Sequence, residues 1–193
     1  MLDFLALAQE CAPTVQPQTM AALARVESGF NPYAIGVVRG RLVRQPVARD
    51  EAIATARSLE AQGFNFSLGV GQVNRYNLAR YGLDYASAFD ACANLRAGSA
   101  ILTDCYARAK KSVSDSQDAL RAAFSCYYSG NFVTGFRDGY VAKVVGDPPE
   151  RAAAPIAVLR TGGPSRGGSK VSPPRGFSPA GSQVPSSPSA LLF

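Results

Sequence analysis

Residues 17–34 read PQTMAALARVESGFNPYA, and this stretch decides the fold. Its apolar side chains recur at a spacing of three or four, which predicts an amphipathic helix over Pro17–Ser28. Proline suits the first turn of a helix, and Gly29 favours its end. Glu27 therefore lies near the carboxyl end of a helix that buries one side.

The position of Glu27 favours a raised pKa. A carboxylate there faces the negative end of the helix dipole, and burial would disfavour its charge further. A general acid that works near neutral pH needs such a shift. The alternative interpretation is a surface glutamate before a helix stop. The other four glutamates are predicted on polar helix faces or in the tail: Glu10, Glu51, Glu60 and Glu150.

Most of the first 146 residues read as helix. Periodicity and capping residues predict helices over about 2–11, 17–28, 49–62, 74–81, 90–111, 116–129 and 138–145. The stretch Ala34–Val47 changes period, because two apolar pairs flank Arg39-Gly40-Arg41. This pattern predicts a short β-hairpin. The expected fold is thus mainly α, of the α+β kind, with one small hairpin.

A change of composition divides the chain into two parts. Pro, Gly and Ser make up half of residues 148–193. Such a segment buries too little apolar surface to offset the entropy lost on ordering. We therefore expect a folded domain over residues 1–146 and a disordered tail over residues 147–193.

Composition narrows the classes of function. The chain has no histidine, which excludes Ser-His-Asp chemistry and the usual zinc sites, and we expect neither metal nor cofactor. Its net charge is +6, without the dense basic stripe that nucleic-acid binding favours. No stretch is apolar enough to predict a transmembrane segment. Residues 1–8 carry Asp3 and read as a first helix, with an unusual export signal as the alternative.

Four cysteines, and no Cys-x-x-Cys pair, favour two disulfides in an oxidising compartment over metal binding. Buried free thiols are the alternative. Cys92 and Cys105 lie on one predicted helix, about 20 Å apart, so they cannot pair with each other. Each would join that helix to Cys11 or Cys126. The two remaining connectivities stay open.

Five segments resemble, in order, the motifs of soluble lytic transglycosylases, a branch of the lysozyme-like superfamily. They are Glu27–Ala34, Ser67–Asn74 with a Gly-x-x-Gln pattern, Phe89–Gly98, Cys126–Asn131 and Tyr140–Val144. The first and fourth are most similar to the subgroup attached to type IV secretion systems. One departure is Tyr128, which stands where the family has asparagine and puts substrate contacts at that position in doubt.

The resemblance implies a lysozyme-like fold and Glu27 as the single catalytic acid/base. Glu27 would protonate the β-1,4 glycosidic oxygen between N-acetylmuramic acid and N-acetylglucosamine. The substrate's own acetamido group and C6 hydroxyl would then close a 1,6-anhydro ring. Substrate-binding candidates are Ser28 near the acid, Gly69 and Gly71 for close backbone approach, Gln72 for its amide, Tyr127 lining the cleft and Tyr140 orienting Glu27.

The same resemblance implies a periplasmic enzyme whose partners are peptidoglycan strands and type IV secretion components. Local cleavage would open the cell wall for the secretion apparatus. Two alternatives remain. One is a non-catalytic module that binds peptidoglycan or serves as a scaffold. The other is a muramidase that hydrolyses the same bond.

Overall fold

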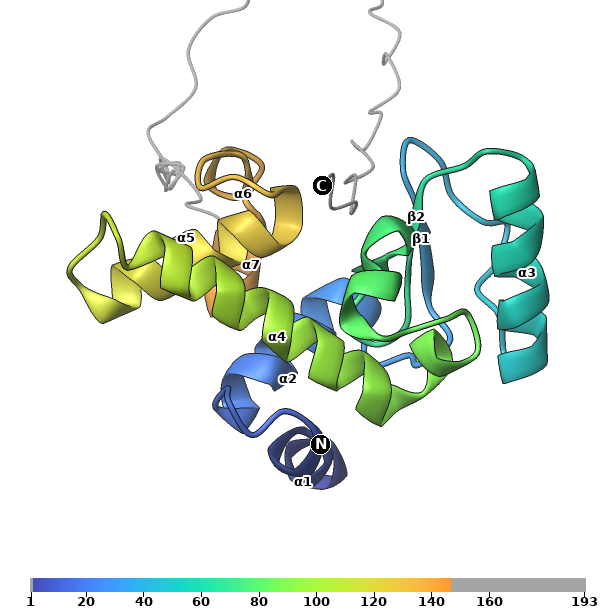
Figure 1. Cartoon of the computed structure of the whole chain (residues 1–193), viewed down its shortest axis with the longest axis horizontal. Helices are drawn as coiled ribbons and strands as arrows, with labels where there is room; N and C mark the ends of the chain where they lie inside the picture. Colours follow the sequence, from blue (N-terminus) through green and yellow to red (C-terminus); the bar gives the residue numbers. More distant parts are fainter. Residues whose placement is uncertain (1, 147–193) are drawn as a thin grey trace, which may run out of the picture. The chain divides into compact units, whose positions relative to one another are not determined.

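A 19-residue helix, α4 (Ala91–Ala109), runs through the middle of residues 2–146, the part that the computed structural model describes (Figure 1). Asp90 caps it, because its carboxylate accepts the backbone N–H of Ala93 at 2.8 Å. α4 packs against α1 (Leu2–Cys11) and α5 (Ser116–Ser129), and one side is buried along its whole length. The other elements are arranged around this helix.

The helix α2 (Pro17–Ser28) has the predicted bounds, as α1 does. Met20, Leu23 and Ala24 are fully buried on the side that the sequence pattern indicated. Gly29 ends α2 with a φ of +59°, a backbone conformation that costs glycine little. This sharp end fixes where the side chain of Glu27 leaves the helix.

The sheet has three short antiparallel strands in the order β1 (Ile35–Val37), β2 (Phe66–Leu68) and β3 (Val73–Asn74). Ile35 lies opposite Leu68, and Ser67 lies opposite Asn74. The four residues between β2 and β3 form a tight connection. The predicted mainly helical domain with a small β element is confirmed.

The location of the predicted hairpin is wrong. Val37 does enter a strand, but its partner is Phe66 of β2, beyond the helix α3 (Arg49–Ala61). The side chain of Val43, expected in the second strand, is fully exposed. Leu42 is half-buried against the core, but Val43 covers no apolar surface and gains nothing from strand pairing, so residues 38–48 form a loop.

The later helices differ in detail from the prediction. The expected helix over 138–145 is the shorter α7 (Tyr140–Val145), and a short helix that the sequence did not predict, α6 (Thr134–Arg137), precedes it. Gly139 separates them with a φ of +72°. The expected helix over 74–81 consists of two 3₁₀ turns, η1 (Arg75–Asn77) and η2 (Ala79–Tyr81), and a third turn, η3 (Ser87–Phe89), precedes α4.

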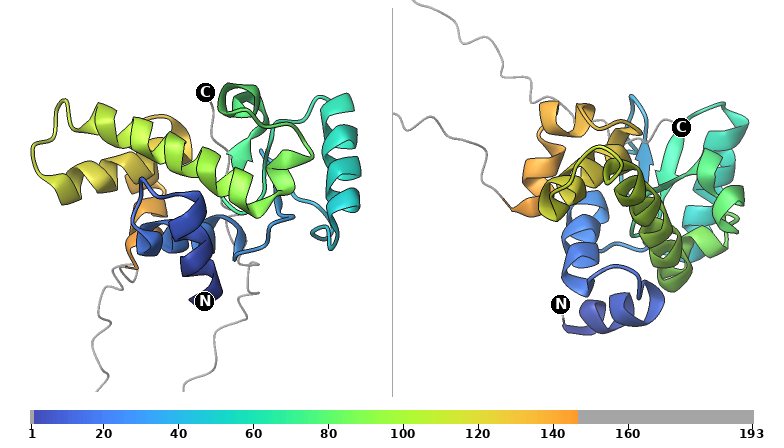
Figure 2. Two further views of the ribbon diagram at one scale, coloured as in Figure 1. Left: turned by 60° about the horizontal axis from the view of Figure 1, so that its bottom comes forward. Right: turned by 60° about the vertical axis from the view of Figure 1, so that its left-hand side comes forward.

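Two disulfides attach neighbouring helices to α4. Cys11 pairs with Cys92, and Cys105 pairs with Cys126, at Cα–Cα distances of 5.1 and 5.7 Å. One bond joins α1 to the first turn of α4, and the other joins the C-terminal half of α4 to α5. Figure 2 shows the ribbons of α1 and α5 beside that of α4. Of the two connectivities that the sequence left open, the structure has this one, and it restrains α4 near both ends.

The predicted tail, residues 147–193, lies outside the described residues. Within residues 2–146, no helix has the length and apolar character needed to cross a membrane.

Candidate active site

Glu27 is the second-last residue of α2, and its side chain is partly buried. Its Oε1 accepts a hydrogen bond from the hydroxyl of Tyr140, the first residue of α7. The two residues are 113 positions apart in sequence. The carboxyl group is thus held where two distant segments of the chain meet.

Burial raises the pKa of Glu27 to about 7, although the hydrogen bond from Tyr140 acts in the opposite direction. The hydrogen bond lowers the pKa because it stabilises the ionised carboxylate. At neutral pH a substantial fraction of the side chain therefore carries its proton. The group can serve as an acid and then, once ionised, as a base.

Tyr140 is itself held by an aromatic partner. Its ring stacks on that of Tyr128, with centroids 4.6 Å apart and planes at 18°. Burial and the nearby Glu27 charge raise the pKa of Tyr140 well above its usual value, so its hydroxyl stays a donor. Tyr128, which departs from the family motif, thereby supports the acid through packing. The sequence interpretation did not find this role.

The connection between β2 and β3, residues 69–72, lies against α4. Gly69 has a φ of +78°, and a Cβ there would lie 2.3 Å from the Ala88 carbonyl oxygen. The backbone N–H of Gly71 donates to Oδ1 of Asn94 at 2.7 Å. Only glycine permits so close a contact between this loop and its neighbours.

Asn94 fixes this loop from α4. Its Nδ2 donates to the carbonyls of Leu68 and Ala88 at 2.9 and 2.8 Å, while Oδ1 accepts from Gly71. The side chain is fully buried, so these bonds replace all contact with water. The sequence interpretation gave Asn94 no role. The sequence signal that could have indicated this role is an amide side chain on the apolar face of a predicted helix.

Ser28 and Gln72 connect the same loop to other segments. The Ser28 hydroxyl lies 2.8 Å from the carbonyl oxygen of Val70, which ties α2 to the loop. Gln72 donates through Nε2 to the carbonyls of Ala34 and Gly69 at 3.1 and 2.8 Å. The amide N–H groups of Gln72, which we expected to contact the substrate, therefore donate to backbone carbonyls instead. The carbonyl oxygen is the part of its amide that remains for a ligand contact.

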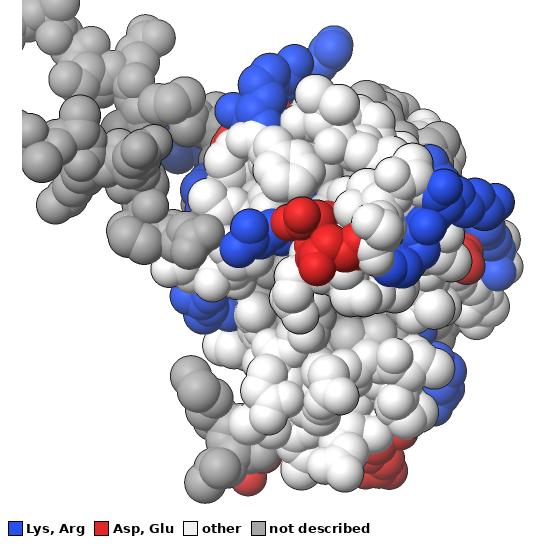
Figure 3. Space-filling model, turned by 90° about the vertical axis from the view of Figure 1, so that its left-hand side faces the viewer, with Lys and Arg blue, Asp and Glu red and all other residues white. Residues whose placement is uncertain are grey.

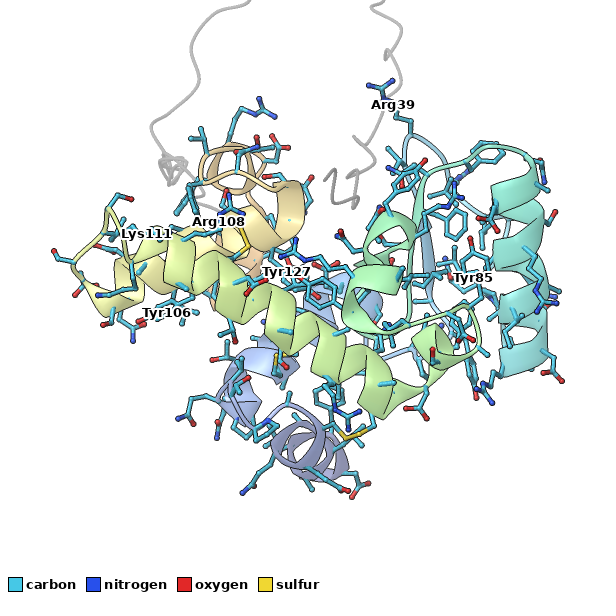
Figure 4. All side chains as sticks on the ribbon, in the orientation of Figure 1. Arg39, Tyr85, Tyr106, Arg108, Lys111 and Tyr127 are labelled. Atoms are coloured by element: carbon cyan, nitrogen blue, oxygen red, sulfur yellow. A yellow bond between two sulfur atoms is a disulfide. The ribbon has the colours of Figure 1, made fainter. Side chains whose placement is uncertain are left out.

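Tyr127 was expected to line the cleft, and the structure corrects this expectation. The side chain is 0% exposed, and its hydroxyl donates to the Gly71 carbonyl at 2.5 Å. Figure 4 shows it directed into the middle of the domain. A buried ring cannot present a surface to a sugar. Tyr127 instead holds the loop from α5, at the same glycine, Gly71, that Asn94 contacts from α4.

Residues 2–146 contain no group of three or more His, Cys, Asp or Glu side chains that could hold a metal ion. The site thus offers one carboxyl group with a raised pKa, one phenolic donor and a glycine-containing loop held by side-chain hydrogen bonds.

Comparison with known proteins places these residues in a family. The profile described as "Transglycosylase SLT domain" matches residues 4–140. The "Type IV secretion system protein virB1" of Brucella suis biovar 1 is 64% identical over 165 residues, which cover 82% of this chain and 69% of the relative. "Protein virB1" of Agrobacterium fabrum is 37% identical over 144 residues, covering 74% of this chain and 58% of the relative. No solved structure matches significantly.

Replacing the acid tests its burial. The folded-state pKa of Glu27, about 7, lies above the ordinary value of 4.5, so the folded protein binds extra protons between these pH values. Its free energy of unfolding should therefore fall as pH rises through this window. Glu27→Gln has nothing to titrate there. We expect the variant's stability relative to wild type to increase from pH 4.5 to 8, by at most about 3 kcal/mol. Urea unfolding at several pH values measures this difference, and a constant difference would contradict the assigned burial.

Removing the buried amide tests the loop clamp. Asn94→Ala leaves one N–H and two carbonyls without their partner, so we expect a loss of roughly 2–4 kcal/mol in the free energy of unfolding. Ser99→Ala is the matched control on α4, since Ser99 is also buried but bonds only to the carbonyl of Arg96. The control should cost about 1 kcal/mol or less. Equal costs for the two variants would refute a clamp at Asn94.

Proposed function

The chain belongs to the transglycosylase SLT domain family of peptidoglycan lytic transglycosylases, and we propose that it leaves 1,6-anhydro ends on the strands it cleaves. The bond broken is the β-1,4 link between N-acetylmuramic acid and N-acetylglucosamine. One observation carries the proposal. A single carboxyl group, that of Glu27, has its pKa raised to about 7 by burial and is held by Tyr140.

In the first step, Glu27 gives its proton to the glycosidic oxygen as the C1–O bond of the muramic acid breaks. The leaving N-acetylglucosamine departs with a free hydroxyl. Positive charge develops at the anomeric carbon, and the acetamido oxygen of the same sugar stabilises it. The Tyr140 hydroxyl stabilises the carboxylate left on Glu27, because it donates directly to Oε1.

In the second step, ionised Glu27 takes the proton from the C6 hydroxyl of the muramic acid. The C6 oxygen bonds to C1 and closes the 1,6-anhydro ring, so the proton returns to Glu27 and no water is consumed. A two-carboxylate glycosidase needs its second acid within about 10 Å. Burial is the leading cause of the raised Glu27 pKa, so this one group can act first as an acid and then as a base, which supports the one-acid route.

We also propose that the enzyme acts in the periplasm, alongside a type IV secretion apparatus. The Brucella suis relative carries that system in its name. Two disulfides suit an oxidising compartment, where the peptidoglycan substrate also lies. Local cleavage of glycan strands would make a gap through which the apparatus could be assembled.

Product analysis tests the reaction. Purified sacculi digested with the protein should release anhydro-muropeptides, identified by mass spectrometry. Glu27→Gln keeps the size of the side chain but cannot donate a proton, so we expect release to fall at least a thousandfold. Reducing-end muramic acid would establish a hydrolysing muramidase instead. Sacculus binding without any product would favour a non-catalytic scaffold.

The Tyr140 hydrogen bond predicts a shift in the pH profile. Activity should fall as pH rises through the pKa of Glu27, about 7, because the first step needs the protonated acid. Tyr140→Phe removes the bond that lowers this pKa, so the falling limb of kcat/KM should move to higher pH. Tyr76→Phe is the control, since Tyr76 is 58% exposed. A falling limb that stays in place, or moves to lower pH, would argue against this role.

A further inference from the structure

A pocket of about 300 Å³ lies between the 3₁₀ turns η1–η2 and the C-terminal half of α4. Its size is at the lower end of the range for small-ligand sites. The charged and aromatic side chains that line it are Arg80, Tyr81, Asp104, Arg108 and Lys111. None of them is used by the reaction described above.

The loop of residues 69–72 and the pocket contact the same face of α4. Asn94, Gly98, Ile101, Cys105 and Arg108 follow at spacings of three and four, so they share a face of the helix. Asn94 clamps the loop, and the next member, Gly98, lies against the Tyr127 hydroxyl. The following three members line the pocket. Arg108 is ten residues beyond Gly98, about 15 Å along the helix.

The acid of the pocket is already engaged. Asp104 accepts from Nη2 of Arg80 at 3.2 Å and from the hydroxyl of Tyr81 at 3.3 Å. The positive charge of Arg80 is thereby balanced. The other two basic side chains of the pocket therefore supply the charge that can attract a ligand.

Those cations are Arg108 and Lys111, near the C-terminal end of α4 (Figure 4). The Arg108 guanidinium lies 5.4 Å from the ring centre of Phe132, which fixes its direction. Neither cation pairs with a carboxylate within residues 2–146. On the face drawn in Figure 3, basic side chains gather in separate groups with acidic ones between them, so attraction of an anion there is local.

We propose that Arg108 and Lys111 bind the carboxylates of the peptide stems that muramic acid carries. This inference rests on the proposed function, since it concerns the substrate on which Glu27 is proposed to act. The sugars of a glycan strand present hydroxyl and acetamido groups, which need no cations. The stem peptides carry free carboxylates and extend away from the sugar ring. Arg108 lies about 21 Å along α4 from Asn94, the residue that contacts the loop, and it suits such a substituent best because guanidinium binds carboxylate through two parallel hydrogen bonds.

The test compares two forms of one substrate. Soluble glycan strands with intact stems are offered to the enzyme, together with the same strands after their peptide carboxylates are converted to methylamides. Wild type should cleave the first about tenfold faster in kcat/KM, mainly through KM. Arg108→Gln/Lys111→Gln should reduce this ratio to about two. Its rate on the methylamide strands should change less than twofold.

The matched control is Arg41→Gln/Arg57→Gln, which removes the same charge from exposed positions outside the pocket. It should keep the wild-type ratio. Because the Arg108 side chain also packs on Phe132, Lys111→Gln alone is a second variant, expected to lower the ratio about threefold. A wild-type ratio near one would overturn the proposal. So would a double variant that loses activity equally on both forms.

A binding measurement separates this inference from the proposed reaction. In the Glu27→Gln background, the affinity for each form is measured by calorimetry, with and without the pocket substitutions. The preference for free carboxylates should persist there and weaken as salt is raised. Absence of anhydro products from wild type would contradict the proposed reaction, but the preference for free carboxylates could still be measured. Equal affinity for both forms would contradict the pocket assignment alone.

Discussion

The hydrogen bond from Tyr140 to Glu27 is the interaction on which the site depends. The carboxyl group of Glu27 must be desolvated enough to keep its proton near neutral pH. It must also ionise during the reaction, and a donor to the carboxylate reduces the free-energy cost of that buried charge. Burial raises its pKa, and one phenolic donor lowers it again. Because donor and acceptor come from α7 and α2, this balance exists only when the two segments are brought together.

Most polar side chains around the acid hold backbone in place. Asn94, Gln72 and Tyr127 bond to backbone groups of the β2–β3 loop, and Ser28 connects α2 to it. A buried amide or hydroxyl stabilises only where every group finds a partner, so such a network specifies one loop conformation. The loop is thereby rigid before substrate arrives. The chemistry is left to one carboxyl group, whose neighbours determine its position and its protonation.

Local features were predictable from the sequence, and long-range ones were not. The bounds of α1, α2 and α5 follow from periodicity and end signals within each segment. The pairing of β1 with β2 depends on residues about thirty positions apart, and the sequence around Val37 does not indicate which segment it pairs with. Asn94 and Tyr128 owe their roles to what packs against them. The disulfide connectivity likewise required three-dimensional proximity, since spacing excluded only one pairing.

One rigid helix explains how the acid and the basic pocket can work together. The protein can bind a stem peptide at a fixed distance from the scissile bond only if the side chains that bind the peptide do not move relative to the loop. α4 meets this requirement, because Asn94 and Arg108 lie on one face of the same helix. Its disulfides to α1 and α5 restrain it near both ends. The Cys105–Cys126 bond lies beside Arg108, whose Nη1 is 3.6 Å from the Cys126 sulfur. One of the two covalent restraints on α4 is therefore adjacent to the proposed carboxylate ligand site at Arg108.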